Sequence, residues 1–237
     1  MLNLYITSSS KKQGKTLLTA GIAATMQSLG YTTSVYKPIQ TSGKEINGFM
    51  QSPDLTFLKT VDPYINTHFS YLYKSKSEPL VASENENEQI DIDFINKEYK
   101  RILTLSECTI LDGDSGILSP IAPNMLNADM IRLLNIPVLI VTKPDENAIN
   151  NTLMTIACAL EKGIEVRGVI INDIPDDCPK ELLTSIPRVI EEFTNVKILG
   201  LIPHLKEKTP EELITAILNG IDIESVFNVK IEKLDIN

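Results

Sequence analysis

The first residues of this chain carry a short polar loop between an apolar strand and a helix, and this combination constrains the fold most. Residues 2–7 predict a strand, residues 8–16 read SSSKKQGKT, and apolar positions at four-residue spacing predict a helix over residues 14–29. The Gly-Lys-Thr ending of a phosphate-binding loop is intact, although Ser8 stands where the pattern has its first glycine. Such a loop presents backbone N–H groups and a helix N-terminus to phosphate oxygens. The sequence therefore predicts binding of a nucleoside triphosphate.

The residues at the end of this loop each have a chemical role in the prediction. Lys15 neutralises the β- and γ-phosphate oxygens, the Thr16 hydroxyl binds Mg²⁺, and the backbone at Lys12, Gln13 and Gly14 surrounds the phosphates. The alternative is a chance Gly-Lys-Thr at a helix start, but the preceding strand and the amphipathic helix favour phosphate binding. Lys11 and Lys12, inside the loop, are interpreted equally well as a solvated stretch or as extra cations beside a triphosphate.

The rest of the chain alternates strand patterns with helix patterns. Strands are expected at residues 32–37, 108–111, 137–142, 166–171 and 196–201, and helices at 54–59, 92–105, 148–161, 180–193 and 211–218. Pro38 is expected to end the second strand. Continuous apolar strands between helices predict an α/β fold of P-loop NTPase type, with a doubly wound, mainly parallel sheet and helices on both faces. No linker or repeat interrupts residues 1–237, so one nucleotide-binding domain is expected.

Two segments give weaker patterns. The aromatic patch at residues 69–73 is compatible with a strand, and the acidic residues 84–88 predict an exposed segment. The tail, residues 223–237, mixes charged residues with valine and isoleucine, and it is interpreted either as a last strand or as loose chain.

The composition disfavours several kinds of partner. A net charge of −9 and a pI near 4.8 argue against nucleic acid, because affinity for that polyanion depends on basic side chains that displace its counterions. No apolar run approaches the roughly 20 residues of a membrane span, so no membrane association is expected. Three scattered cysteines without a Cys-x-x-Cys pair, and a start without a basic leader, predict a cytoplasmic protein.

Lys37, Asp112 and Asp54 are the charged candidates for the same site. Lys37 ends the second predicted strand and Asp112 follows the buried strand 108–111, so both are expected at the carboxyl edge of the sheet, where open α/β folds bind ligands. Lys37 is interpreted as stabilising charge on a transferring phosphoryl group, the alternative being a solvated strand cap. Asp54 is either a helix cap or a metal ligand. Both aspartates with Thr16 supply the oxygen ligands that Mg²⁺ takes in addition to phosphate and water.

Several motifs also occur along the chain in a defined order, namely Gly14-Lys15-Thr16, Tyr36-Lys37-Pro38, Asp54, Asp112-Gly113 and Asn172-Asp173. The ordered set resembles the dethiobiotin synthetases, a family of P-loop ATP-dependent carboligases. The resemblance runs from residue 2 to about residue 205 and includes the strand ends at residues 168–173 and 199–203.

The resemblance implies an ATP- and Mg²⁺-dependent ring closure in biotin biosynthesis. In this reaction 7,8-diaminononanoate takes up CO₂ as a carbamate, is phosphorylated, and cyclises to a ureido ring while ADP and phosphate leave. The family pattern implies that Lys15 and Lys37 hold the γ-phosphate and the carbamate, and that Thr41 contacts the substrate.

The resemblance also assigns roles to three residues in the second half of the chain. It implies that Asn172 reads the adenine edge and that Pro203 contacts the nucleotide. Asn150 is implied to reach the substrate carboxylate across a homodimer interface. From the residues alone, both asparagines are interpreted equally well as simple capping or turn residues.

The chain departs from the family pattern at several positions near the substrate. Lys11 and Lys12 replace an acidic loop residue, Asp112 replaces a glutamate, and Asp114 adds a carboxylate after it. Residues 78–83, EPLVAS, replace a Ser-Pro-His segment. Two alternatives therefore stay open. One is another P-loop ATP-dependent synthetase acting on a different acceptor, and the other is a nucleotide-binding regulatory module without chemistry.

Overall fold

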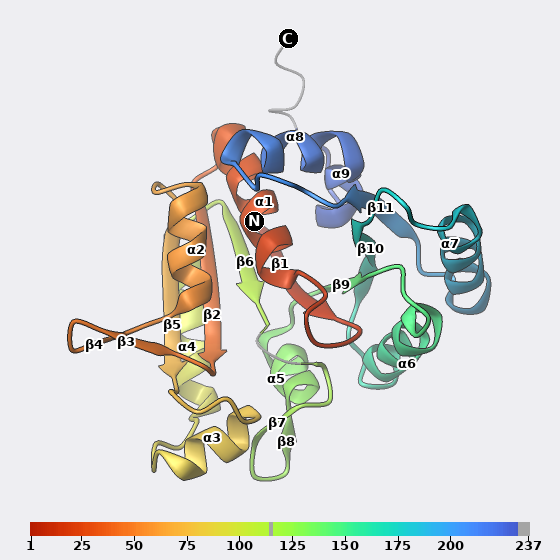
Figure 1. Ribbon diagram of the computed structural model, residues 1–237. Helices are drawn as coiled ribbons and strands as arrows, with labels where there is room; N and C mark the ends of the chain where they lie inside the picture. The colour runs from red at the N-terminus through yellow and green to blue at the C-terminus, as the bar shows by residue number, and fades with distance from the viewer. Residues whose placement is uncertain (114–115, 232–237) are drawn as a thin grey trace.

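A computed structural model of the chain describes residues 1–113 and 116–231. Its centre is a seven-stranded sheet in the order β11-β10-β9-β1-β6-β2-β5, in which every pair of neighbours is parallel (Figure 1). The predicted doubly wound parallel sheet is confirmed. The strands are β1 (Leu2–Ser8), β2 (Thr33–Gln40), β5 (Asn66–Leu72), β6 (Cys108–Asp112), β9 (Val138–Thr142), β10 (Val166–Ile174) and β11 (Ile198–Pro203). The carboxylate expected from Asp114 and the last part of the tail, residues 232–237, lie outside the described residues.

Helices cover both faces of this sheet because alternate side chains of each strand point to opposite faces. In β1, Tyr5 belongs to one hydrophobic core, whereas Leu4 and Ile6 belong to the other. The core containing Tyr5 is closed by α4 (Ile92–Leu103), α5 (Asn127–Leu134), α6 (Ala148–Glu161) and α7 (Lys180–Thr194). The core containing Leu4 is closed by α1 (Lys15–Ser28), α2 (Pro53–Val61), α8 (Pro210–Gly220) and α9 (Ile223–Phe227). Burial on both faces explains why the strand sequences read as continuous apolar runs.

The order of the strands places one set of loops where ligands bind. From β1 the chain passes to β2, β5 and β6 on one side, and then to β9, β10 and β11 on the other. The strands run parallel, so their carboxyl ends share one edge of the sheet. The loop after β1 lies at the point where the direction of winding reverses, which is the usual ligand site of an open α/β sheet.

The second strand runs further than the sequence pattern predicts, because Pro38 does not end it. β2 continues to Gln40 and pairs with β5 over almost its whole length, but it pairs with β6 only at residues 33–36. Proline lacks an N–H group, and it is tolerated where one side of a strand has no partner. Lys37 consequently lies within the strand rather than at its end.

The two weaker patterns are resolved, and several short elements appear that the sequence pattern misses. The aromatic patch overlaps β5, which is one of the interpretations left open for it, and residues 84–88 are exposed, as expected, although they begin within α3 (Pro79–Asn85). Two hairpins also form, β3 (Lys44–Ile46) with β4 (Phe49–Gln51) and β7 (Pro120–Ala122) with β8 (Met125–Leu126). The start of the tail forms the helix α9 and not a last strand. None of the helices in the described ranges combines the length and the apolar composition of a membrane-spanning helix.

Candidate active site

The loop between β1 and α1 takes its shape from two residues in the left-handed region and from a contact with β10. Lys12 has a φ angle of 62° and Gly14 a φ angle of 85°. A β-carbon added to Gly14 would lie 2.3 Å from Nδ2 of Asn172, so both the backbone angle and the available space require glycine. Nδ2 of Asn172 donates a hydrogen bond to the carbonyl oxygen of Gln13 at 2.9 Å. The end of β10 therefore fixes the loop.

Asn172 and Pro203, which were assigned to the nucleotide, lie at the ends of adjacent strands. Asn172 is buried, with 1% of its surface exposed, and its amide nitrogen is occupied by the loop carbonyl. In the structure Asn172 thus stabilises the phosphate loop through this hydrogen bond. Its contact with adenine stays a prediction. Pro203 ends β11 and is exposed. Both residues lie on the β10 and β11 side of the phosphate loop.

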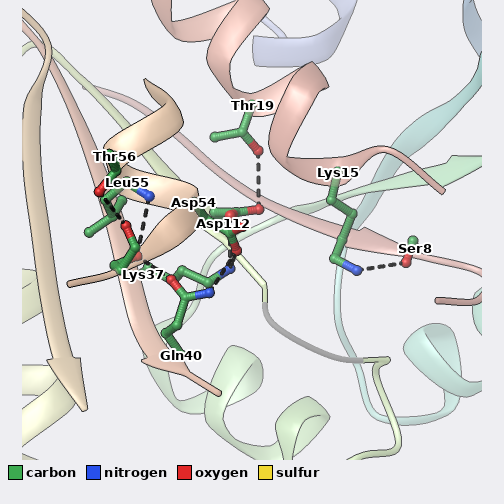
Figure 2. A network of polar contacts seen from close by, with 10 residues as sticks. Ser8, Lys15, Thr19, Lys37, Gln40, Asp54, Leu55, Thr56 and Asp112 are labelled. Carbon is green, nitrogen blue, oxygen red and sulfur yellow. Dashed lines mark hydrogen bonds and ion pairs between the residues drawn. The ribbon is translucent and has the colours of Figure 1, made fainter. Parts of the chain in front are cut away.

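Ser8, which stands at the position of the expected glycine, is bonded to the lysine of the loop. Nζ of Lys15 donates to Oγ of Ser8 at 3.0 Å, and Oγ of Ser8 donates to the carbonyl oxygen of Ser10 at 2.6 Å (Figure 2). The side chain of Gln13 also donates to the Ser10 hydroxyl. The loop is therefore folded on its own polar side chains. In the described part of the chain, no side chain or backbone group bonds the Thr16 hydroxyl.

Lys37 lies between the two aspartates with which it was grouped from the sequence. Its Nζ is 2.7 Å from Oδ2 of Asp54 and 2.8 Å from Oδ2 of Asp112 (Figure 2). Only 1% of Lys37 and none of Asp112 is exposed. The other oxygen of Asp112 accepts a bond from the hydroxyl of Thr19 on α1, at 3.3 Å. A buried ammonium is thus paired with two carboxylates directly beside the loop.

The two carboxyl groups differ in their electrostatic surroundings. Burial raises the pKa of Asp112 above its usual value, and the Lys37 ammonium only partly opposes this effect. Burial also acts to raise the pKa of Asp54, but there the charge and hydrogen bond of Lys37, with a bond from Gln40, outweigh it and the pKa is lowered. An additional cation beside Asp112 would favour its ionised form. The site therefore gains from a positive charge that arrives with a ligand.

A chain of hydrogen bonds connects Asp54 to the start of α2. Nε2 of Gln40 donates to Oδ2 of Asp54 at 2.9 Å, and the Ser52 hydroxyl donates to Oε1 of Gln40. Oγ of Ser52 also accepts from the backbone N–H of Leu55 at 3.2 Å, so Ser52 is the N-cap of α2. Asp54 is therefore not the helix cap, and its carboxylate is directed to Lys37.

A cavity of about 280 Å³ lies between the phosphate loop, the end of β2 and the segment before α3. It brings together the predicted residues Lys12, Lys15, Thr41 and Asp54. Lys37 and Asp112 do not line it, but Lys37 contacts Asp54 at its wall. The other residues lining the cavity are Lys11, Gln40, Ser42, Lys76, Ser77 and Glu78.

Asn150 is one of the predicted site residues that do not line this cavity. It lies exposed on the first turn of α6, where Nδ2 contacts Asn151 and Met154. The proposed reach of Asn150 across a homodimer interface stays a prediction, because it concerns a second copy of the chain.

The predicted magnesium ligands have the chemistry that the ion requires. In the described ranges, no cluster of three or more His, Cys, Asp or Glu side chains is suited to hold a metal ion alone. A nucleotide-bound Mg²⁺ needs fewer protein ligands, because phosphate and water oxygens fill most of its positions. The hydroxyl of Thr16 and the carboxylates of Asp54 and Asp112 are all oxygen donors, so this set fits Mg²⁺ held chiefly by the nucleotide.

Several residues of the site were not singled out from the sequence. Thr19 follows Lys15 by four positions, which places both on one face of α1. This helical spacing is the sequence signal that could have identified Thr19. Gln40 was hidden by the expectation that β2 ends before Pro38. Asp173, with a φ angle of 58°, contacts Lys143 at 2.5 Å and His204 at 2.6 Å. Asp173 belongs to the Asn172-Asp173 motif, but no sequence spacing indicates its two contacts, since Lys143, Asp173 and His204 lie at or just after the ends of three different strands.

The sheet, the loop and the paired Lys37 define a P-loop nucleotide-binding α/β protein. A family model described as an AAA domain matches residues 2–212, and the chain belongs to this family. The chain is 28% identical to the ATP-dependent dethiobiotin synthetase BioD of Bacillus subtilis (strain 168) over 231 residues, covering 96% of this chain and 98% of that protein. It is also 28% identical to the protein of the same name from Nitrosopumilus maritimus (strain SCM1), covering 95% and 99%. The resemblance to dethiobiotin synthetases is confirmed.

Solved structures support the fold alone. The ParA family ATPase from Chlorobium tepidum TLS superimposes with a TM-score of 0.61 at 15% identity, covering 100% of this chain and 98% of that one. The MinD cell division protein of Aquifex aeolicus gives a TM-score of 0.56 at 18% identity, covering 92% and 89%. These likenesses confirm the P-loop architecture and carry no statement about the reaction.

Proposed function

We propose that this chain is a cytoplasmic, ATP- and Mg²⁺-dependent dethiobiotin synthetase of biotin biosynthesis. The coarser part of this function, an ATP-dependent ligase similar to BioD, is supported by the family and by relatives matched over nearly their whole length. The finer part names the substrates as ATP, CO₂ and 7,8-diaminononanoate. It is supported by the loop, by Lys37 with its carboxylates, and by the adjoining cavity.

The proposed reaction has three steps, and the bonds and protons are accounted for in each. One amine nitrogen of the acceptor forms a bond to CO₂ and loses a proton, which gives a carbamate. A carbamate oxygen then takes the γ-phosphoryl group, and the bond to the ADP oxygen breaks. Finally the second amine attacks the carbamate carbon, loses a proton, and expels phosphate as the ureido ring closes.

The residues of the loop would bind the nucleotide in this reaction. Lys15 exchanges its present partner, the Ser8 hydroxyl, for β- and γ-phosphate oxygens. Thr16, Asp54 and Asp112 would hold Mg²⁺, and the ion when bound offsets charge on the phosphates. Asp54 and Asp112 at present share Lys37, so a cation beside them leaves its ammonium available for the carbamate or the transferring phosphoryl group.

The acceptor would lie in the cavity beside the end of β2. Thr41 lines this cavity together with Lys15, so a hydroxyl donor and the phosphate-binding lysine face the same space. The walls are polar and charged, which suits small molecules carrying amines and carboxylates. We further propose a homodimer in which Asn150 of a second copy reaches the carboxylate of the acceptor.

The single observation that carries the proposal is the pairing of Lys37 with Asp54 at the wall of a cavity that Lys15 also lines. Purified protein should release ADP from MgATP and bicarbonate only when 7,8-diaminononanoate is added. Lys15→Ala should abolish this release. ADP release that does not depend on the diamine would argue against the proposal.

A second candidate function is a related synthetase with a different acceptor. It is favoured by one observation, the four lysines among the cavity-lining residues, Lys11, Lys12, Lys15 and Lys76. Such a wall would also suit an acceptor with more negative charge than a diamine. ADP release stimulated by a dicarboxylate or a phosphorylated amine, with none for the diamine, would favour this candidate.

A further inference from the structure

Glu78 places a carboxylate on the wall of the cavity opposite the phosphate loop. It is the residue immediately before α3, and Oε1 lies 2.7 Å from Nζ of Lys11 in the loop. Its other oxygen, Oε2, is shielded from solvent and has no hydrogen-bond partner within the described residues. The carboxylate therefore bridges the two sides of the cavity while part of its acceptor capacity is unused.

The second carboxylate of the cavity wall is already engaged. Asp54 accepts bonds from Lys37 and Gln40, and it is one of the proposed ligands of Mg²⁺. Of the two acidic residues that line the cavity, Glu78 is thus the one left to receive a positively charged or N–H-donating group of the acceptor. The remaining charged groups of the wall are lysines, which would repel an ammonium group.

The present partner of Glu78 is easily displaced. The side chain of Lys11 is 76% exposed, and that of Glu78 is 32% exposed. Ion pairs between exposed groups are weak, because water screens the charges and a long side chain must be held in one position. Lys11 can therefore return to solvent at little cost when a better-placed donor enters the cavity.

The ionisation of Glu78 agrees with this role. Burial acts to raise its pKa, but the nearby Lys11 ammonium and the Ser119 side chain outweigh burial, and the pKa lies below its usual value. The group is consequently an anion at neutral pH, able to accept hydrogen bonds from an amine.

We propose that Glu78 binds an amine of the acceptor, and that Lys11 is its counter-ion until the acceptor arrives. The role deepens the proposed function, on which it rests, since it names the residue that would select an amine in a cavity otherwise rich in lysine. Glu78 is a substrate-binding residue in this account and takes no part in proton transfer.

Steady-state kinetics with Glu78→Gln test the proposal. At saturating MgATP and bicarbonate, the KM for 7,8-diaminononanoate should rise about tenfold or more, because a charge-assisted hydrogen bond is lost. Binding of a fluorescent ATP analogue should change less than about twofold. Glu84→Gln is the matched control, since Glu84 is exposed on α3, the helix that follows Glu78, and does not line the cavity. Its KM should equal that of the wild type.

Two further variants separate charge from shape. Glu78→Asp keeps the charge on a shorter side chain and should recover part of the lost affinity for the diamine. Lys11→Ala should leave the KM unchanged or lower it, because a competitor is removed. A KM for Glu78→Gln equal to that of the wild type would overturn the proposal, as would a raised KM for Lys11→Ala. Wild-type protein without diamine-dependent ADP release would instead overturn the proposed function itself.

Discussion

Lys37 and Asp112 occupy neighbouring strands, β2 and β6, with Nζ 2.8 Å from Oδ2, and both are shielded from water. The preceding residues on these strands, Tyr36 and Leu111, are register partners, so the sheet itself sets this pair. Burying an ion pair requires removal of two hydration shells, and the interaction repays that cost only when both partners are present. The pair therefore couples the stability of the sheet edge to the chemistry of the site.

Lys37→Met should destabilise the protein in a pH-dependent way. Its loss leaves Asp54 and Asp112 without their cation, at an expected cost of about 3 to 5 kcal/mol near neutral pH. Without the ammonium, burial raises the folded-state pKa of these carboxyls above the unfolded value, so the variant loses stability as pH rises and recovers as pH falls. Urea unfolding at pH 7 and pH 5 measures this. Lys97→Met, at an exposed position of α4, is the control. An equal loss at both pH values would contradict the buried-pair account.

Lys37→Met should also separate turnover from nucleotide affinity. The ammonium is needed most where charge develops on the transferring group, so kcat should fall by at least about a hundredfold while ATP binding changes little. Steady-state ADP release and equilibrium binding of an ATP analogue check this expectation. If kcat and the affinity for the ATP analogue fell by the same factor, Lys37 would have no particular role in the chemical step.

Gly14→Ala should reduce the free energy of nucleotide binding more than it reduces the free energy of unfolding. The added β-carbon would lie 2.3 Å from Nδ2 of Asn172. The alanine would also have to adopt the positive φ angle of 85°. The strain is expected to cost about 1 to 3 kcal/mol and to distort the loop. In the double variant with Asn172→Ala the clash is removed but the backbone strain persists, so affinity should recover only in part. Full recovery would show that space alone limits this position.

Ser8→Gly should raise the affinity for ATP. The substitution removes the hydroxyl that holds Lys15 at 3.0 Å, and the lysine then reaches the phosphates without breaking that bond. One neutral-to-charged hydrogen bond predicts a gain of roughly 1 to 2 kcal/mol, which is about tenfold in affinity. Isothermal titration with MgATP is the measurement. Reduced affinity would mean that Ser8 itself contributes to phosphate binding.

Asp129→Asn should destabilise the protein only above acidic pH. A hydrogen bond from Lys162, with another from the backbone N–H of Leu126, lowers the pKa of Asp129. The carboxylate therefore stabilises the fold at pH values above its unfolded pKa, and this contribution is lost as pH falls through the folded pKa. We expect a loss of less than about 1 kcal/mol at pH 7, because water screens this partly exposed ion pair, and the loss should shrink toward pH 2, as measured by urea unfolding. A loss that is constant with pH would indicate packing rather than charge.

Much of the architecture follows from the sequence because its elements are long and strongly patterned. α6 is found at the bounds that its apolar spacing predicts, and the buried strand β6 is one residue longer than expected. The short elements were missed for a physical reason. Hairpins such as β3 with β4 have three-residue strands that bury little surface, so no periodic pattern marks them.

The candidate site was partly predictable for the same reason. Lys15 and Lys37 are reached from local motifs, since each follows or ends a strand whose direction is known. Glu78 and Asn172 depend on contacts between segments far apart in the chain, with Lys11 and Gln13 respectively. Sequence spacing does not encode such contacts. Lys37 illustrates both cases, because its strand was predicted but its burial between two aspartates was not.

The fate of labelled carbon shows whether the protein closes the ureido ring. Wild-type protein is incubated with MgATP, isotope-labelled bicarbonate and 7,8-diaminononanoate, and the products are separated and analysed by mass spectrometry. We expect a cyclised product that contains the labelled carbon as its ureido carbonyl, with ADP formed in equal amount. Unchanged diamine alongside tightly bound ATP would contradict this expectation.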